Sequence, residues 1–289
     1  MQGLQPLASL SQRLKADDLA RDSLIMVTAG FASGLFSYLY QLSMGILLTP
    51  EDYGALFSLT SLLVIVCVFT RAVTLTVAKL TSKFKAEGRP GAINYIWHSS
   101  LKRGLLVGVL SFALLAGLSP LLSLLLNIDS YVYPMILFAS LIFAFSLSGN
   151  WGIMQGTQRF RSFGSSQVLW AFLKPAFAVP FVYFGFGVAG GLAALPLSFA
   201  VVFILTFFLL HNLSQAGKER VELGGFRAYA GFTILAMFGI TALTNLDVVL
   251  AKHYLAPADA GCYSAVSVLG MIATLCSWRW TSIPTYTLW

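Results

Sequence analysis

Three ionisable side chains lie inside long apolar stretches of this sequence, where a charge is costly. Lys174 occurs in WAFLKPAFAVPF, Arg71 in VFTRAVTLTVAK and Asp247 in TNLDVVLAKHY. Ionisable groups surrounded by hydrocarbon commonly mark the path of a substrate or an ion. Arg71 and Lys174 suit an anionic group such as a phosphate, which arginine can bind in a bidentate way. Asp247 suits a proton or sodium site, together with the nearby Asn245.

Each of these residues also has a structural interpretation. The long side chains of Arg71 and Lys174 could extend along the helix to the inner face of the membrane. Asp247 could pair with Lys252, although the five-residue separation is poor for a helix, on which partners sit three or four residues apart. Prolines 175 and 180 free backbone carbonyls and kink a helix beside Lys174, which favours a binding role for this lysine.

Two uncharged side chains, Asn150 and Gln155, lie in SGNWGIMQG near the inner end of a predicted membrane span. We include both as candidate substrate-binding residues. Hydrogen bonding between helices is the more common role of such residues within membranes.

Signals of catalysis or metal binding are lacking in the sequence. It contains no P-loop, GxSxG, HExxH or paired-carboxylate motif, and its three cysteines form no CxxC pair. The three histidines are far apart. We therefore expect neither an enzyme nor a bound metal or cofactor.

The composition of the whole chain places these residues in a membrane protein. Of 289 residues, 57% are hydrophobic and 10% are charged, and the mean hydropathy is +0.80. Soluble domains carry about 25% charged residues, so a cytosolic enzyme, a disordered chain and a nucleic-acid-binding domain are excluded. A membrane helix needs about 20 apolar residues. We predict eight spans, near residues 23–47, 54–77, 103–126, 132–153, 166–186, 188–211, 229–251 and 260–278.

The basic residues predict the orientation of these spans. All of the 18 lysines and arginines except Arg71, Lys174 and Lys252 fall before the first span, in every second connection after it, or after the eighth span. By the positive-inside rule these segments are cytoplasmic, which places the amino terminus inside. The net charge of +7 then faces the lipids of the cytoplasmic leaflet. We expect a multi-pass protein of the inner (cytoplasmic) membrane with no nucleic-acid partner.

A short internal repeat suggests two related halves. LTPEDYGALFSLTSLL (48–63) and LAPADAGCYSAVSVLG (255–270) align without a gap at an offset of 207 residues. In each turn, proline ends one helix and the acidic residue is expected to cap the next. Parallel repeats of this kind build transporters with a substrate site between the halves. The matching pairs are Pro50 with Pro257, Asp52 with Asp259, Gly54 with Gly261 and Leu62 with Leu269.

We therefore predict an all-α polytopic membrane protein. A complete N-terminal six-helix bundle is followed by the first two helices of a second, truncated bundle, as expected for a truncated or frame-shifted product. The predicted segments are a cytoplasmic, interfacial helix (1–22), the six-span bundle (23–211), a cytoplasmic linker (212–228), two spans of the second bundle (229–278) and an atypical tail (279–289).

Three segments resemble a known family: LLTPEDYGALFSLTSLL, MQGTQRFRSFGSSQ and NLDVVLAKHYLAPADAGCYSAVSVL. They are similar to the polysaccharide-transporter branch of the multidrug/oligosaccharidyl-lipid/polysaccharide flippase superfamily. The resemblance implies two helix bundles around a central cavity. It also implies outward flipping of a lipid-linked (polyprenyl-diphosphate) oligosaccharide for surface polysaccharide synthesis, with polysaccharide polymerase and ligase proteins as expected partners.

Three other functions remain open at this point. The first is a drug or organic-cation antiporter of the same superfamily, although basic cavity residues disfavour a cationic cargo. The second is an inactive fragment. The third, a membrane-bound polymerase or glycosyltransferase, is disfavoured because no large outer loop is present to build a catalytic site.

Overall fold

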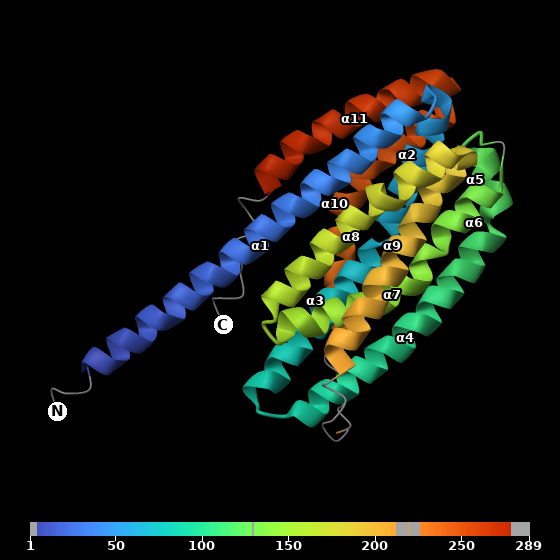
Figure 1. Cartoon of the computed structure of the whole chain (residues 1–289). Helices are drawn as coiled ribbons and strands as arrows, with labels where there is room; N and C mark the ends of the chain where they lie inside the picture. Colours follow the sequence, from blue (N-terminus) through green and yellow to red (C-terminus); the bar gives the residue numbers. More distant parts are fainter. Residues whose placement is uncertain (1–4, 129, 212–218, 220–225, 279–289) are drawn as a thin grey trace.

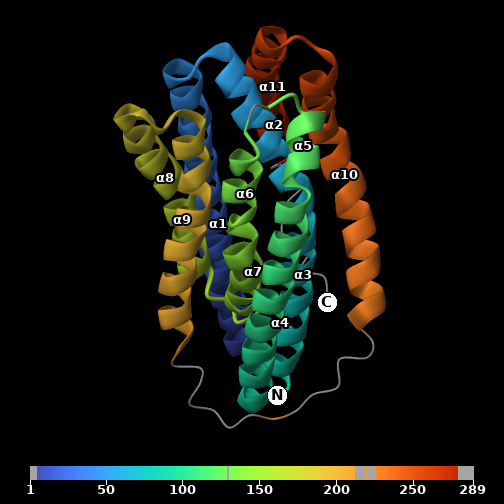
Figure 2. The same ribbon diagram turned by 90° about the vertical axis from the view of Figure 1, so that its right-hand side faces the viewer.

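The computed structural model describes residues 5–128, 130–211, 219 and 226–278, and every regular element within them is helical. This confirms the predicted all-helical fold. Figures 1 and 2 show the helices running alongside one another in one elongated bundle. They are α1 (Gln5–Leu47), α2 (Pro50–Val66), α3 (Val68–Ala86), α4 (Pro90–Gly117), α5 (Ser119–Leu125), α6 (Val132–Phe138), α7 (Ser140–Gly156), α8 (Phe160–Phe181), the π-helical turn η1 (Val182–Phe186), α9 (Gly187–Leu210), α10 (Phe226–Tyr254) and α11 (Pro257–Trp278).

Several segments of the described chain are long and apolar enough to cross a bilayer. There are five by this criterion, and the last contains both α8 and α9. Each predicted apolar stretch coincides with one helix or with two consecutive helices, which supports a multi-pass protein. The number of crossings and their orientation stay predictions. The five segments are Arg21–Leu47, Pro50–Ala86, Pro90–Gly117, Val132–Gly156 and Phe160–Leu210.

Helix α1 includes residues on both sides of the predicted boundary between 22 and 23. It is continuous over 43 residues, roughly 65 Å at 1.5 Å per residue, about twice the hydrocarbon thickness. Its first half extends beyond the rest of the bundle (Figure 1). No break separates residues 5–22 from the predicted span, because the sequence from Leu7 to Ala29 contains neither proline nor glycine. The predicted helix over residues 1–22 and the first predicted span are therefore joined, from Gln5 onward, in one helix. The cytoplasmic, interfacial location of residues 1–22 stays a prediction.

A sharp turn joins α8 to α9. Gly185 and Gly187 have φ angles of +91° and +49°, a region that glycine adopts at little cost. The two helices pack side by side after this turn (Figure 2). The long apolar segment from 160 to 210 is therefore a hairpin, as the predicted spans on either side of residue 187 require.

Helix α7 lies at the centre of the bundle, where it packs against α3, α4 and α9. Glycines bring these backbones close together. A Cβ atom on Gly104 of α4 would lie 2.8 Å from the carbonyl oxygen of Phe145, and one on Gly152 would lie 2.7 Å from that of Thr74. Such contacts leave no room for a larger residue, as is typical of helix packing in membranes.

The two repeated turns meet in space. A Cβ atom on Gly54 would lie 3.0 Å from the backbone nitrogen of Gly261, and one on Gly261 would collide with the carbonyl oxygen of Pro50. The cap of α2 differs from the prediction. Thr49 is the N-cap, and its hydroxyl accepts a hydrogen bond from the backbone N–H of Asp52 at 3.3 Å. Pro50 occupies the first helical position, so the residue before it is the one that can cap the first turn.

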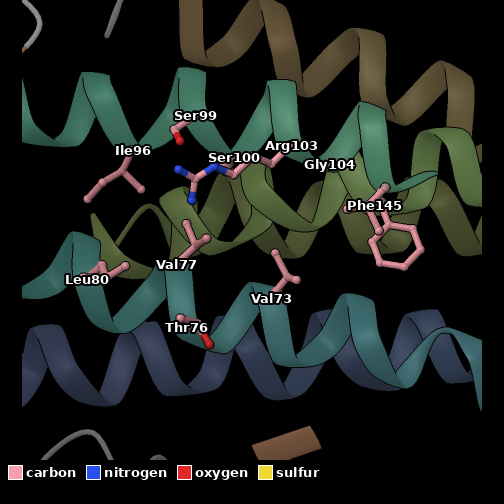
Figure 3. Close-up of a pocket in the computed structure, with 11 residues that line it drawn as sticks. Val73, Thr76, Val77, Leu80, Ile96, Ser99, Ser100, Arg103, Gly104 and Phe145 are labelled. Carbon is pink, nitrogen blue, oxygen red and sulfur yellow. The ribbon is translucent and has the colours of Figure 1, made fainter. Parts of the chain in front are cut away.

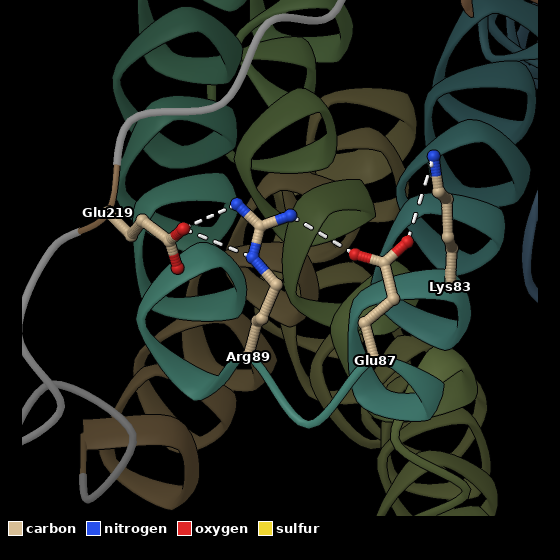
Figure 4. A network of polar contacts seen from close by, with 4 residues as sticks. All are labelled: Lys83, Glu87, Arg89 and Glu219. Carbon is tan, nitrogen blue, oxygen red and sulfur yellow. Dashed lines mark hydrogen bonds and ion pairs between the residues drawn. The ribbon is translucent and has the colours of Figure 1, made fainter.

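A polar network joins Glu219, which belongs to the predicted linker (212–228), to the turn between α3 and α4 (Figure 4). Of this linker, the structure describes Glu219 and the residues from 226 onward. The guanidinium of Arg89 donates to the carboxylates of Glu219 and Glu87, and the backbone N–H of Glu219 donates to the carbonyl of Gly91 at 3.2 Å. Hydrogen bonding to Arg89 lowers the pKa of Glu219 and raises that of Arg89.

Candidate functional site

A cavity of about 730 Å³ lies among α1, α2, α3, α7, α8 and α9, with one lining residue each from α10 and α11. Its wall combines aromatic side chains with many hydroxyl and amide groups. No carboxylate belongs to this lining within the described chain. The polar and charged members are Ser33, Ser37, Tyr38, Tyr40, Gln41, Thr60, Thr70, Arg71, Thr74, Gln155, Gln167 and Lys174, and the aromatic ones include Trp151, Phe163, Trp170 and Phe199.

Lys174 is the buried cation of this cavity. It is 7% exposed and lies roughly 21 Å along α8 from the start of that helix. Its Nζ donates a hydrogen bond to the Oγ of Ser37 on α1 at 2.9 Å and lies 4.2 Å from the ring centroid of Trp170. The side chain thus reaches across to a neighbouring helix, and does not extend along α8 to a membrane face.

Arg71 is the second cation of the cavity. It lies one turn beyond Cys67, the single residue that interrupts the α2–α3 segment. Cys67, Thr70, Arg71 and Thr74 all line the cavity, and their spacing places them on one face of the helix. The arginine side chain is exposed, so its guanidinium is open to a ligand.

The structure brings Arg71, Lys174 and Gln155 together in the cavity wall, but not Asn150. Asn150 is completely buried. Its Oδ1 accepts from the indole N–H of Trp97 at 2.9 Å, and its Nδ2 donates to the hydroxyl of Thr206 at 3.0 Å. These bonds join α7 to α4 and α9. The geometry corresponds to the alternative role of Asn150, hydrogen bonding between helices, and we remove this residue from the site.

Asp247 and Asn245 lie on α10, and neither lines the cavity. Asn245 is 6% exposed, and its amide donates to the carbonyl of Thr241 at 2.9 Å. The Oδ2 of Asp247 accepts from the hydroxyl of Tyr263 at 3.0 Å, whereas its Oδ1 is buried without a partner in the described structure. The partner of Asp247 is thus Tyr263 and not Lys252. The two residues of the predicted ion site thus lie outside the lining of the cavity that Arg71 and Lys174 share.

Several cavity residues were missed from sequence alone, notably Ser37, Gln41, Gln167 and Trp170. Helical spacing would have found them. Ser33, Ser37 and Gln41 recur every fourth residue of α1. On α8, Phe163, Gln167, Trp170 and Lys174 follow the 4-3-4 spacing of one helix face.

Two polar atoms of the cavity wall have unused hydrogen-bonding capacity. The Oε1 of Gln41 and the Nε1 of Trp170 are buried and have no hydrogen-bond partner in the described part of the chain. Buried polar groups are nearly always satisfied in folded proteins. These atoms can therefore contribute an acceptor and a donor to a bound molecule. Metal binding has no comparable support, because the described residues contain no cluster of three histidine, cysteine or acidic side chains.

Comparison with known proteins relates this geometry to solved structures. No family model matches the sequence, and no curated protein matches it. An inward-facing multidrug resistance MATE family transporter of the MOP superfamily superposes with a TM-score of 0.66 at 15% identity, over 83% of this chain and 59% of that one. The fold is that of MATE transporters.

Two further structures support the MATE fold. An outward-facing multidrug resistance MATE transporter gives a TM-score of 0.60 at 19% identity, covering 81% of this chain and 54% of that one. A MOP superfamily transporter from Pyrococcus furiosus gives 0.62 at 17% identity, covering 81% and 54%. That protein is described as having a binding pocket of reverse polarity that suggests a different function. The present chain spans little more than half the length of these transporters.

Proposed function

We propose that this chain carries the substrate-binding bundle of a membrane transporter that moves a lipid-linked oligosaccharide across the cytoplasmic membrane. One observation carries the proposal. Arg71 and Lys174 line the same cavity, and no carboxylate lines it within the described chain. A cavity with two positive charges favours an anionic cargo. The MATE fold supports transport as the activity.

The cavity chemistry suits a polyprenyl diphosphate that carries sugars. An ammonium group has three donors, and Lys174 uses one of them on Ser37, which leaves donors for a phosphate oxygen. Arg71 can add a bidentate contact to the same diphosphate. The amides of Gln41, Gln155 and Gln167 offer donors and acceptors to sugar hydroxyl groups. We retain Arg71, Lys174 and Gln155 as substrate-binding residues.

Alternating access needs two bodies that move relative to each other. In our proposal these are the bundle before the linker and the body to which α10 and α11 belong. They meet at the repeated turns through Gly54 and Gly261. Asp247, with Asn245, remains our proposed ion-coupling group, and its unpartnered Oδ1 supports that role. It would act through movement of α10, because it does not line the cavity. Polysaccharide polymerase and ligase proteins are the partners that we propose.

Export of organic cations is the second candidate function. The neighbouring structures include multidrug transporters, and the ring of Trp170 lies against the ammonium group of Lys174. Aromatic rings bind ligand cations in the same way. A cationic drug would, however, enter a cavity that already contains two positive charges, and this favours the anionic cargo.

Binding to the purified chain tests the proposal. A fluorescent polyprenyl-diphosphate oligosaccharide and a fluorescent organic cation are titrated against the wild type, Arg71→Gln and Lys174→Met. We expect the anionic probe to bind and each substitution to weaken binding by about tenfold, since a charge-assisted hydrogen bond contributes about 1.5–3 kcal/mol. Lys102→Gln is the matched control, because this exposed lysine lies outside the cavity.

The opposite pattern would overturn the proposal. If the organic cation binds and the oligosaccharide probe does not, the cargo is an organic cation and the second candidate function replaces the first. Equal binding of the anionic probe by the wild type and the Arg71→Gln, Lys174→Met double variant would remove the cations from the site.

A further inference from the structure

A second hollow lies on the opposite side of α3 from the cavity. This groove has a volume of about 230 Å³ and is formed by α3, α4 and α7 (Figure 3). Its wall is apolar, with Val77, Leu80, Ile96, Val107 and Phe145 among its members, and Arg103 is its one charged residue. The groove and the cavity share no lining residue.

Helix α3 separates the two spaces. Arg71, Thr74 and Leu75 line the cavity, whereas Val73, Thr76, Val77 and Leu80 line the groove. These two sets of positions fall on opposite faces of a helix with 3.6 residues per turn. A molecule in the groove would therefore pack against the back of the segment that presents Arg71.

Arg103 gives the groove a chemical preference. Figure 3 shows its guanidinium directed into the groove between α4 and α3. It forms no hydrogen bond or ion pair with any residue that the structure describes. Arg103 follows Lys102 and belongs to the basic connection that the sequence places on the inner side. A guanidinium in this setting suits a phosphate group.

The surface next to the groove faces lipid. Leu105, Leu106, Val107 and Leu110, which follow Arg103 on α4, are 41–60% exposed. A run of exposed large apolar side chains within a long apolar helix contacts acyl chains in a membrane. The groove thus combines access from the bilayer, an apolar wall and one cation at the predicted level of the inner head groups.

We propose that this groove binds an anionic phospholipid of the inner leaflet. The guanidinium of Arg103 contacts its phosphate, and one acyl chain lies between α3 and α4 against Val77 and Val107. Charge complementarity identifies the occupant, because the head group of an anionic phospholipid has a net negative charge that Arg103 can neutralise, whereas a zwitterionic head group has none. The bound lipid packs against the face of α3 opposite Arg71 and so stabilises this part of the cavity wall.

Lipid titration of the full chain tests this proposal. Phosphatidylglycerol and phosphatidylcholine are added to detergent-purified protein, and bound lipid is counted by native mass spectrometry. We expect tighter binding of phosphatidylglycerol to the wild type and a fall of about tenfold in its affinity in Arg103→Gln. Lys102→Gln, which removes a neighbouring charge outside the groove, is expected to leave it unchanged.

Two further variants separate the effect of the charge on Arg103 from the effect of the groove volume. Arg103→Lys keeps the charge and is expected to retain most of the preference for phosphatidylglycerol. Val107→Trp fills the groove at a half-exposed position and is expected to abolish retention while Arg103 is still present. The proposal is overturned if Arg103→Gln and the wild type bind phosphatidylglycerol equally. It is also overturned if polyprenyl phosphate is retained at this groove and phosphatidylglycerol is not.

Discussion

Asn150 and Lys174 are both polar side chains buried in the helix bundle, yet they are held in different ways. The amide of Asn150 is bonded at both ends, to Trp97 and to Thr206, and lies outside the cavity. Lys174 donates one hydrogen bond, to Ser37, and is among the residues that line a cavity of about 730 Å³. Burial of a polar group is therefore not by itself a sign of a binding site. Unused hydrogen-bonding capacity beside a cavity is the better guide to a candidate residue.

The largest effect is expected for Asn150→Leu. This change leaves the indole N–H of Trp97 without its acceptor and removes the link to Thr206, which costs about 2 kcal/mol or more of folding stability. Thermal unfolding in detergent measures the loss. Gln155→Leu on the same helix is the control, because Gln155 is only half-buried and lines the cavity. Comparable losses in the two variants would contradict the structural role of Asn150.

The opposite result is expected for Lys174→Met. Methionine retains the apolar stem and removes a charge whose burial opposes folding, so stability should stay equal or rise. Affinity for the diphosphate probe should fall about tenfold, or about 1.4 kcal/mol. Parallel unfolding and binding measurements test both statements. A variant that unfolds easily and yet binds the probe normally would reverse the assignments of Lys174 and Asn150.

A smaller effect is expected for Gln155→Ala. The side chain lines the cavity without a hydrogen-bond partner in the described structure, so its removal leaves folding unchanged. Loss of one neutral hydrogen bond to a sugar hydroxyl should weaken binding of the full oligosaccharide probe a few-fold. Binding of a polyprenyl diphosphate without sugars should be unaffected, and a similar loss for both probes would place Gln155 at the diphosphate.

The smallest effect is expected at the exposed pair Arg89–Glu219. Hydrogen bonding to Arg89 lowers the pKa of Glu219 in the folded protein. The contact therefore stabilises the attachment of Glu219 to the α3–α4 turn above the ordinary glutamate pKa of about 4.3, and this contribution is lost as the pH falls through the lowered value. As the pH falls through this lowered pKa, pepsin cleavage of the linker in the wild type should approach the rate in Glu219→Gln. A constant ratio of the two rates from pH 5 to pH 3 would show that the pair does not hold the linker.

Hydropathy predicted the apolar helices well, because a span must satisfy its backbone and bury few charges. The break at Cys67 was not predicted, since neither proline nor glycine occurs beside it. Arg71 and Lys174 were visible because charges are rare in such stretches.

Asn150 and Gln155 were treated alike as amides near one helix end, although five residues of an α-helix separate them by about 140°. Their different environments depend on which helices α7 packs against. The residue type, an amide in both cases, does not predict this packing. Gln155 shares its face with Trp151 and Ala144, which also line the cavity, so a helical projection would have separated the two.

The contact between Gly54 and Gly261 makes the two turns sensitive to any enlargement of either residue. A Cβ atom on Gly54 would meet the backbone of Gly261, and one on Gly261 would meet the carbonyl of Pro50. The two glycines therefore face different parts of the opposing turn. A larger residue at either position would act as a spacer that pushes the start of α2 and the start of α11 apart.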